Sequence, residues 1–178
     1  MTIGMLGGMS WESSAEYYRL ANTIVRERLG GLHSAKVVLH SVDFAEIERM
    51  QVEGRWDDAG KALAEAAASV QAGGADFLLL CTNTMHKVFD QVQAAVDIPM
   101  IHLGDTTAAA IKNAGLTTVG LLGTGFTMDQ PFYRERLESH GCASCSRPQR
   151  TVRPCTGSST TSCASASSGT SPGGRIRT

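Results

Sequence analysis

The segment FLLLCTNTMH, residues Phe77–His86, decides the fold. Its first four residues are all apolar, which is typical of a β-strand that is covered on both faces in a parallel sheet. The residues after this run carry thiol, hydroxyl, amide and imidazole groups, so the side-chain chemistry changes where the strand is predicted to end. Because ligands of open parallel sheets bind beyond the carboxyl ends of the strands, the segment predicts a core strand that leads into a binding site.

Predicted strands and helices alternate on both sides of this segment. Short apolar runs predict further strands at residues 3–6, 36–44, 99–103 and 118–122. Helical periodicity and capping signals predict helices at 13–28 behind an N-cap at Ser10, then at 44–51, 56–72, 84–96, 106–113 behind a cap at Asp105 or Thr106, and 129–140. Strands that alternate with helices pair in parallel through right-handed crossovers. The predicted fold class is therefore α/β, with a doubly wound parallel sheet.

The composition of the chain changes at Gly141. All 17 acidic residues and 11 of the 16 basic residues lie at or before this position, which gives residues 1–141 a net charge of −6. Residues 142–178 hold no acidic residue, nine serines and four of the five cysteines. Such a segment cannot bury enough apolar surface to offset the entropy lost on ordering. We therefore predict that residues 142–178 are a disordered tail.

A change of reading frame near Gly141 accounts for this tail. In the shifted frame, each codon consists of the last base of one written codon and the first two bases of the next one. A codon that overlaps a written cysteine codon in this way encodes Val, Leu or Met. The TCN codons of serine become Val, Ile, Leu or Phe in the same way. Apolar residues then fall at an amphipathic helix spacing, at positions 155, 158, 159 and 163. We predict that residues 142–178 are a frameshift product.

Charge and hydropathy exclude several classes of partner. A net charge of −1 and a pI of about 6.5 do not fit the basic surface of a nucleic-acid-binding protein. No apolar run approaches the roughly 18 residues of a membrane span. The amino terminus has no basic region before its apolar stretch, so we expect no signal peptide and a soluble cytoplasmic protein. Cys142 and Cys145 lack the second close pair of a zinc site, so no metal is predicted.

Two loops after predicted strands carry the candidate site residues. Gly7–Trp11 is rich in glycine but lacks the G-x-G-x-x-G spacing of a dinucleotide site. Its backbone N–H groups and the Ser10 hydroxyl are suited to hold a carboxylate at a helix N-terminus. In the loop Cys81–His86, the polar residues either bind a ligand or cap the next helix, with Cys81 as a small buried residue. Spacing alone leaves both interpretations open, and it favours a hydrogen-bonded helix residue over a metal ligand at His86.

Longer motifs make the chain resemble the cofactor-independent aspartate/glutamate racemase family. The resemblance covers essentially all of residues 1–141. It is carried by IGMLGGMSWES at 3–13, LGGLHSA at 29–35, HSVDF at 40–44, CTNTMHK at 81–87 and LLGT at 121–124, followed by Thr127-Met128 and Phe132-Tyr133. The Cys-Thr-Asn-Thr loop is similar to that of a subgroup in which threonine stands where many members have cysteine.

The resemblance implies two pseudo-symmetric α/β lobes with the active site between them. Residues 1–98 would form the first lobe and residues 99–141 the start of the second. Members of the family remove the α-proton of an amino acid on one face and return one on the other, without pyridoxal phosphate. The resemblance therefore implies aspartate or glutamate as the substrate, and no cofactor.

The resemblance also assigns roles to individual residues. It implies that Thr82 is the first catalytic residue, with Cys81 as the less favoured one. Substrate-binding positions are implied for Met9, Ser10, Gln51, Thr82, Asn83 and Thr84. Sequence pattern alone would instead make Gln51 an exposed residue at the end of a helix.

One departure from the family leads us to expect an impaired racemase. The second catalytic cysteine of the family lies in a Gly-Cys-Thr-Glu motif beyond position 141, and this chain has no such motif. One alternative is a related isomerase or decarboxylase that uses a single base. Another is a protein that binds acidic amino acids without turnover, or a pseudogene product. Apolar faces left uncovered by a shortened second lobe would also favour a homodimer.

Overall fold

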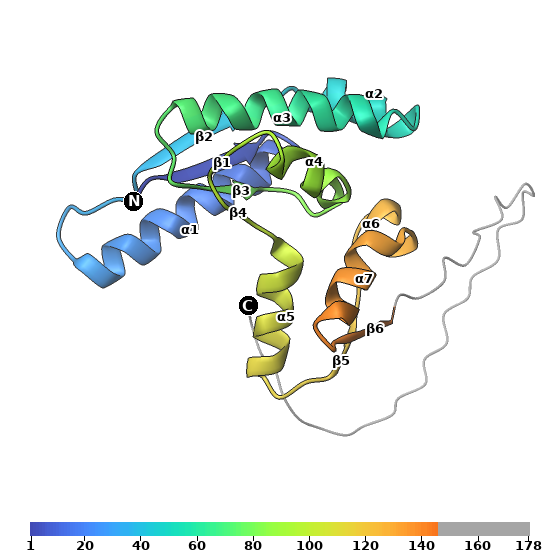
Figure 1. Ribbon diagram of the computed structural model, residues 1–178. Coiled ribbons are helices and arrows are strands. Elements are labelled where there is room, and N and C mark those ends of the chain that lie inside the picture. The colour runs from blue at the N-terminus through green and yellow to red at the C-terminus, as the bar shows by residue number, and fades with distance from the viewer. Residues whose placement is uncertain (146–178) are drawn as a thin grey trace, which may run out of the picture. The chain divides into compact units, whose positions relative to one another are not determined.

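The computed structural model describes residues 1–145, in which helices and strands alternate (Figure 1). The elements up to the segment FLLL are β1 (Ile3–Gly7), α1 (Trp11–Leu29), β2 (Val37–Ser41), α2 (Phe44–Val52), α3 (Trp56–Ala72) and β3 (Phe77–Leu80). After them come the 3-10 helix η1 (Thr84–Val88), α4 (Phe89–Gln93), β4 (Met100–Ile101), α5 (Leu103–Asn113), β5 (Thr118–Gly120), α6 (Gly125–Asp129), α7 (Pro131–Ser139) and β6 (Ala143–Cys145). Most of the predicted tail lies outside the described residues.

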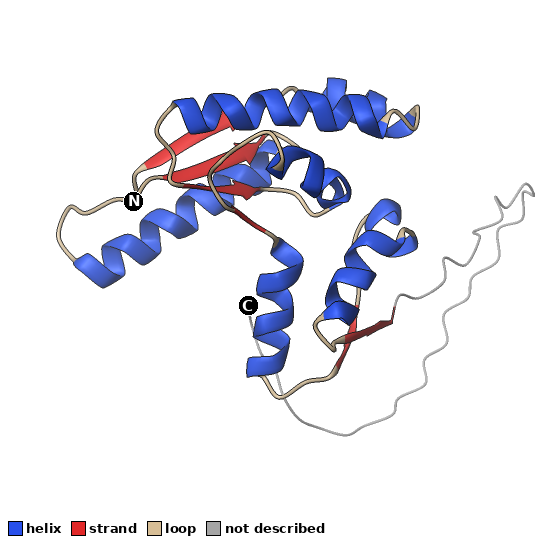
Figure 2. Cartoon of the chain, in the orientation of Figure 1, coloured by secondary structure: helices blue, strands red, loops and turns tan. Residues whose placement is uncertain are grey.

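Four strands form a parallel sheet in the order β2-β1-β3-β4. The inner strand β1 pairs on both sides, with Ile3 opposite Val37 of β2 and opposite Phe77 of β3. Helices α2 and α3 run along one face of the sheet and α1 along the other (Figure 1), and Figure 2 shows the strands between these layers. The predicted α/β fold with a parallel sheet is confirmed. Because β4 belongs to this sheet, the sheet extends past residue 98, and the division into lobes stays a prediction.

The core of this sheet is aliphatic. Leu78 and Leu80 of β3 are completely buried, as are Met5 and Leu6 of β1. Gly4 lets α3 pack tightly on β1, because a Cβ there would lie only 2.7 Å from Val70 Cγ1. Burial of a leucine side chain contributes about 1.5–3 kcal/mol, so Leu78 and Leu80 stabilise the sheet. Phe77 and Leu79 are only partly buried, so one face of β3 is less completely covered than its sequence predicts.

The strand predicted at residues 99–103 is shorter in the structure, because α5 begins directly after β4. His102 is the N-cap of α5, and its Nδ1 accepts a hydrogen bond from the Gly104 N–H at 2.9 Å. The cap is therefore His102 and not Asp105 or Thr106. Histidine is not among the favoured capping residues, which is why the sequence pattern placed the start of this helix too late.

Two predicted helices are divided in the structure. The helix predicted at residues 84–96 consists of η1 and the short α4. The helix predicted at 129–140 is preceded by α6 and begins at Pro131 as α7. Pro131 occupies the first turn of α7, where its missing N–H loses no helical hydrogen bond. Within residues 1–145, no helix is both long and apolar enough to cross a lipid bilayer.

A second sheet pairs β5 with β6 in parallel, with Thr118 opposite Ala143. This pairing corrects the predicted start of the disordered tail at residue 142, since β6 lies beyond that point. Cys142 is 1% exposed and packs with α5 and α7, where its Sγ lies 3.8 Å from the Ala108 carbonyl oxygen. Strands pair through their backbones, so small side chains suffice for this short extension.

Candidate active site

The strand order brings the two candidate loops together. From β1 the chain crosses to β2 on one side and then returns to β3 on the other side of β1. The loops after β1 and β3 therefore lie where the strand order reverses, which is where ligands bind in open α/β sheets. The Cys81 N–H donates to the Leu6 carbonyl oxygen at 2.9 Å, which joins the start of the second loop to β1.

Ser14 of α1 fixes the loop after β1. The Gly8 N–H donates to Ser14 Oγ at 2.9 Å, and this hydroxyl donates to the Ser10 carbonyl oxygen at 3.2 Å. Gly8 has a φ of 97° and lies against Val42, whose backbone a Cβ would overlap, so the position requires glycine. The Gly8 N–H is already satisfied by Ser14 of α1, so among the backbone N–H groups of this turn it is not free to bind a carboxylate.

Met9 and Ser10 differ in their exposure. Met9 is 6% exposed and belongs to the core beneath the loop, whereas Ser10 is exposed. Ser10 occupies the predicted N-cap position of α1, but within the described residues its hydroxyl makes no capping hydrogen bond. The Ser10 hydroxyl is therefore available to a ligand at this edge of the sheet.

The polar residues of the loop after β3 also differ in exposure. Cys81 is 1% exposed, and burial raises the pKa of its thiol to about 12, so the thiol keeps its proton at neutral pH. Thr82 is half-buried and Asn83 is exposed. In the described part of the chain the Asn83 side chain makes no cap for η1, so its amide can reach a ligand. Cys81 thus packs as a small buried residue, whereas the next two residues present polar groups.

A cluster of three threonines lies behind this loop. Thr84 Oγ1 is 3.1 Å from Thr124 Oγ1 and 3.4 Å from Thr127 Oγ1, and the latter two oxygens are 3.2 Å apart. Thr124 is the N-cap of α6, and Thr127 is 4% exposed. Thr124 and Thr127 follow the strand predicted at residues 118–122, and the sequence assigned no site residue there. A threonine before a short helix, with a second threonine three residues later, is the signal that could have found this cluster.

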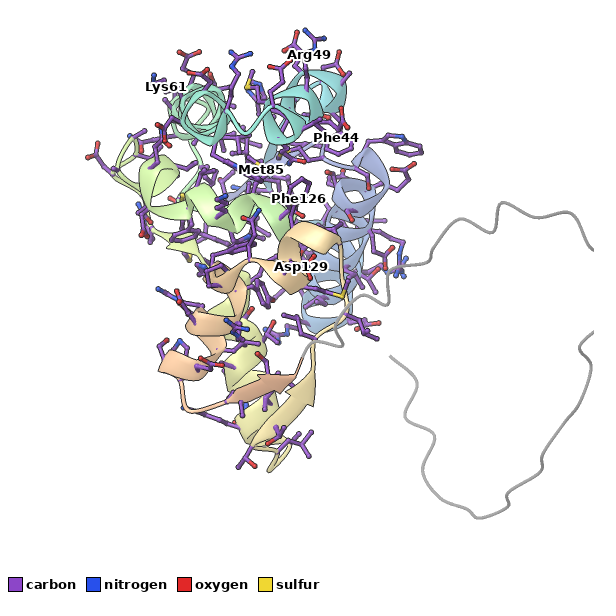
Figure 3. All side chains as sticks on the ribbon, turned by 90° about the vertical axis from the view of Figure 1, so that its right-hand side faces the viewer. Phe44, Arg49, Lys61, Met85, Phe126 and Asp129 are labelled. Carbon is purple, nitrogen blue, oxygen red and sulfur yellow. The ribbon has the colours of Figure 1, made fainter. Side chains whose placement is uncertain are left out.

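Gln51 of α2 points inward and is 7% exposed, contrary to what sequence pattern alone suggested. Its Nε2 lies 2.8 Å from the sulfur of Met85, which follows Thr84 and is completely buried. In Figure 3, Met85 lies inside the layers of helices, whereas Arg49 and Lys61 project outward from α2 and α3. Gln51 is therefore a buried polar side chain of α2 that contacts the residue after Thr84.

His86 is buried and makes two hydrogen bonds. Its Nε2 accepts from the Leu103 N–H at 3.1 Å, so Nδ1 carries the proton and donates to the Thr82 carbonyl oxygen at 2.7 Å. Burial, and then the neighbouring His102, lower the pKa of His86 to about 4, so the ring is neutral at pH 7. The predicted hydrogen-bonded role of His86 agrees with this geometry. Among residues 1–145, no three His, Cys, Asp or Glu side chains gather in the way that a metal ion requires.

Aromatic residues from two helices meet beside the threonine cluster. The rings of Trp56 of α3 and Phe126 of α6 are 5.5 Å apart and nearly perpendicular. Lys87 of η1 places its Nζ 3.9 Å from the centre of the Trp56 ring, which is a cation–π contact. Figure 3 shows Phe126 on α6 close to the level of Met85. These contacts hold α6 near the loop that carries Thr82.

The fold and the candidate site define an α/β protein with two polar loops at the reversal point of a parallel sheet. The sequence profile of the Asp/Glu/hydantoin racemase family matches residues 6–170. The chain belongs to this family. The profile match extends past Gly141 into the predicted tail, residues 142–178.

Solved and curated proteins show the same relationship. A Yersinia pestis structure described as a proposed Asp/Glu racemase is 50% identical, with a TM-score of 0.79, and the match covers 84% of this chain. An aspartate racemase homologue from Pyrococcus horikoshii is 33% identical with a TM-score of 0.75, over 83% of this chain. The broad specificity amino-acid racemase RacX of Bacillus subtilis is 31% identical over 85 residues, which are 48% of this chain.

The chain matches only part of each of these proteins. It covers 66% of the Yersinia chain, 65% of the Pyrococcus chain and 37% of the Bacillus protein. The remaining third of the solved relatives has no counterpart in the match.

Proposed function

We propose that this chain carries the substrate-binding loops and the first proton-transfer residue of an aspartate/glutamate racemase. The observation that carries the proposal is the loop Thr82-Asn83-Thr84, which leaves a buried strand at the reversal point of the sheet and contacts Thr124. Family membership supports an isomerase that acts on an amino acid. Its substrate class is an acidic amino acid, and it needs no cofactor.

The chemical task is to remove a weakly acidic α-proton. Without an electron sink, negative charge that develops at the α-carbon and carboxylate must be stabilised by oriented hydrogen-bond donors. The Asn83 amide and the exposed Ser10 hydroxyl supply such donors from two adjacent loops. Thr84 is buried with its hydroxyl against Thr124 and Thr127, so it contributes to binding by supporting the loop. Met9 and Gln51 form the inner wall of the site, where both are buried.

Thr82 transfers the proton on one face of the substrate. The alternative, Cys81, would need a thiolate, and both its burial and the high pKa of its thiol oppose that. A threonine hydroxyl is a weak base, so the two directions of the reaction are expected to differ in rate. This preference for one enantiomer is the expected signature of the Cys-Thr-Asn-Thr subgroup.

A second candidate function is acidic-amino-acid binding with slow or absent racemisation, or chemistry that uses a single base. The protonated Cys81 thiol favours it, because none of the loop residues described here offers a strong base. Incubation with D- and L-aspartate and with D- and L-glutamate, followed by chiral chromatography, separates the candidates. Formation of the opposite enantiomer supports the racemase, whereas binding without turnover supports the second candidate.

We propose that racemisation is impaired in this chain and that a change of reading frame is the cause. A frameshift after Gly141 would replace the segment in which the family carries its second catalytic cysteine. Sequencing of the DNA across Gly141 tests this hypothesis, and a restored frame should encode a Gly-Cys-Thr-Glu motif. An uninterrupted frame with no such motif in any downstream frame contradicts it.

A cytoplasmic location and a homodimer complete the proposal, and sedimentation of the purified chain tests the dimer.

A further inference from the structure

The His86 ring joins two separate parts of the site. Its Nδ1 lies 2.7 Å from the Thr82 carbonyl oxygen, and its Nε2 lies 3.1 Å from the backbone nitrogen of Leu103. Thr82 follows β3, and Leu103 is the first residue of the helix that follows β4. One rigid ring therefore sets the distance between the loop after β3 and the start of α5.

We infer that His86 is a positioning residue, which holds the Thr82 backbone through the Nδ1–H tautomer and so orients the Thr82 hydroxyl, a role that rests on the proposed function of Thr82. A backbone N–H can only donate, so Leu103 forces Nε2 to accept and leaves the proton on Nδ1. The Thr82 N–H also donates to the Leu80 carbonyl oxygen at 2.9 Å. The residue is thus held through its N–H on one side and through its carbonyl on the other.

The surroundings of His86 prevent the ring from turning. His86 is 3% exposed and stacks on Phe89, with ring centres 5.6 Å apart and planes 17° apart. The His102 ring is steeply inclined to it, with ring centres 4.5 Å apart, and His102 is itself held by the Gly104 N–H. Because a displacement of about 1 Å can cost about 100-fold in rate, a ring fixed in this way is suited to set a proton-transfer group.

Two substitutions separate the two hydrogen bonds. In His86→Asn, the amide nitrogen of asparagine lies two bonds from Cβ, as Nδ1 of histidine does. The hydrogen bond to the Thr82 carbonyl oxygen can therefore be kept, whereas the one from the Leu103 N–H is lost. In His86→Gln, the amide oxygen of glutamine lies three bonds from Cβ, as Nε2 of histidine does. The hydrogen bond from the Leu103 N–H can therefore be kept, whereas the one to the Thr82 carbonyl oxygen is lost. His33→Gln is the matched control, since His33 lies exposed in the loop between α1 and β2.

The full chain and these variants are compared by exchange of the substrate α-proton in D₂O, followed by proton NMR with aspartate and glutamate. We expect His86→Gln to lower kcat about 10- to 100-fold with little change in KM. His86→Asn should keep most of the wild-type kcat. His33→Gln should match the wild type. Equal loss of kcat in both His86 variants, in step with their loss of thermal stability, would overturn the positioning role.

Two measurements without substrate keep this test apart from the proposed function. Nitrogen-15 NMR should show His86 protonated at Nδ1 and not at Nε2 at pH 7, and the opposite tautomer would overturn the positioning role. The carbonyl carbon shift of Thr82 should change in His86→Gln and not in His86→Asn. If the wild type exchanges the α-proton of none of the amino acids, the proposed function fails. The two spectra then test the positioning role of His86 on their own. Equal shifts in both variants would then overturn the positioning role.

Discussion

The hydroxyl oxygens of Thr84 and Thr124, forty residues apart in the chain, lie 3.1 Å from each other. This contact joins the loop after β3 to the N-cap of α6, and Thr127 closes the triangle. Hydroxyl groups in contact couple energetically when each removes the other from water. The relationship therefore predicts how the two residues behave when they are replaced together.

Replacement of Thr84 and Thr124 by valine, singly and together, should show this coupling. The double variant should be more stable than the sum of the single losses predicts, by about 0.5–1.5 kcal/mol, because one hydrogen bond is lost only once. Urea unfolding of the four proteins measures the difference. Additivity within about 0.3 kcal/mol would show that the contact has no energetic weight.

Ser14→Ala should destabilise the protein by about 1–3 kcal/mol, because it leaves the buried Gly8 N–H without its acceptor. Ser69→Ala is the matched control. Ser69 is also a helical serine, but it is exposed and bonds to the Glu65 carbonyl oxygen of its own helix. Urea unfolding should show a change below about 0.5 kcal/mol for the control. Equal effects of the two substitutions would contradict the role of Ser14 in the loop.

The free energy of unfolding should fall as the pH is lowered from about 6.5 to 4. The pKa of His86 is about 4 in the folded protein against 6.5 when the residue is unfolded, so the unfolded chain binds more protons in this window. The stability is complete above pH 6.5 and decreases by about 3 kcal/mol as the pH reaches 4. The pKa of His102 is also lowered, chiefly by burial, which adds to the fall. His86→Asn should flatten this pH profile. An unchanged slope in that variant would show that groups other than His86 cause the pH dependence of stability.

Cys81 should resist alkylation in the folded protein. Its thiol is buried, and its pKa of about 12 leaves almost no thiolate at pH 7.5. Treatment with iodoacetamide, followed by peptide mapping in the mass spectrometer, should show Cys81 modified only after urea is added. Rapid modification of Cys81 in the native protein would indicate an accessible thiolate and would return this residue to the catalytic role.

The sequence predicts the fold well where burial decides the structure. The run FLLL, the alternation of elements and the glycine after β1 suffice for a parallel α/β sheet, and the structure agrees. Sequence pattern fails where a specific side-chain contact decides. His102 caps α5, which no capping preference indicates, and the predicted N-cap Ser10 makes no capping hydrogen bond within the described residues. Ser14 instead bonds the Gly8 N–H of the loop. The contact of Thr84 with Thr124 depends on tertiary structure, so its distance could not be predicted from either segment alone.

The burial of Gln51 illustrates the same limit. A glutamine in the last turn of a helix is usually exposed, yet here the residue is 7% exposed and contacts Met85. Only the packing of α2 against the rest of the protein turns this face inward. Residues 146–178 lie outside the described part, so the predicted disordered tail and its origin in a frameshift stay predictions there.

Exchange of the α-proton of aspartate and glutamate in D₂O tests the central claim most directly, with Thr82→Ala compared against Cys81→Ala in the same chain. We predict exchange by the wild type with one enantiomer preferred, a loss of about 100-fold in Thr82→Ala, and retention of most of the rate in Cys81→Ala. Loss of exchange in Cys81→Ala together with full exchange in Thr82→Ala would contradict the account.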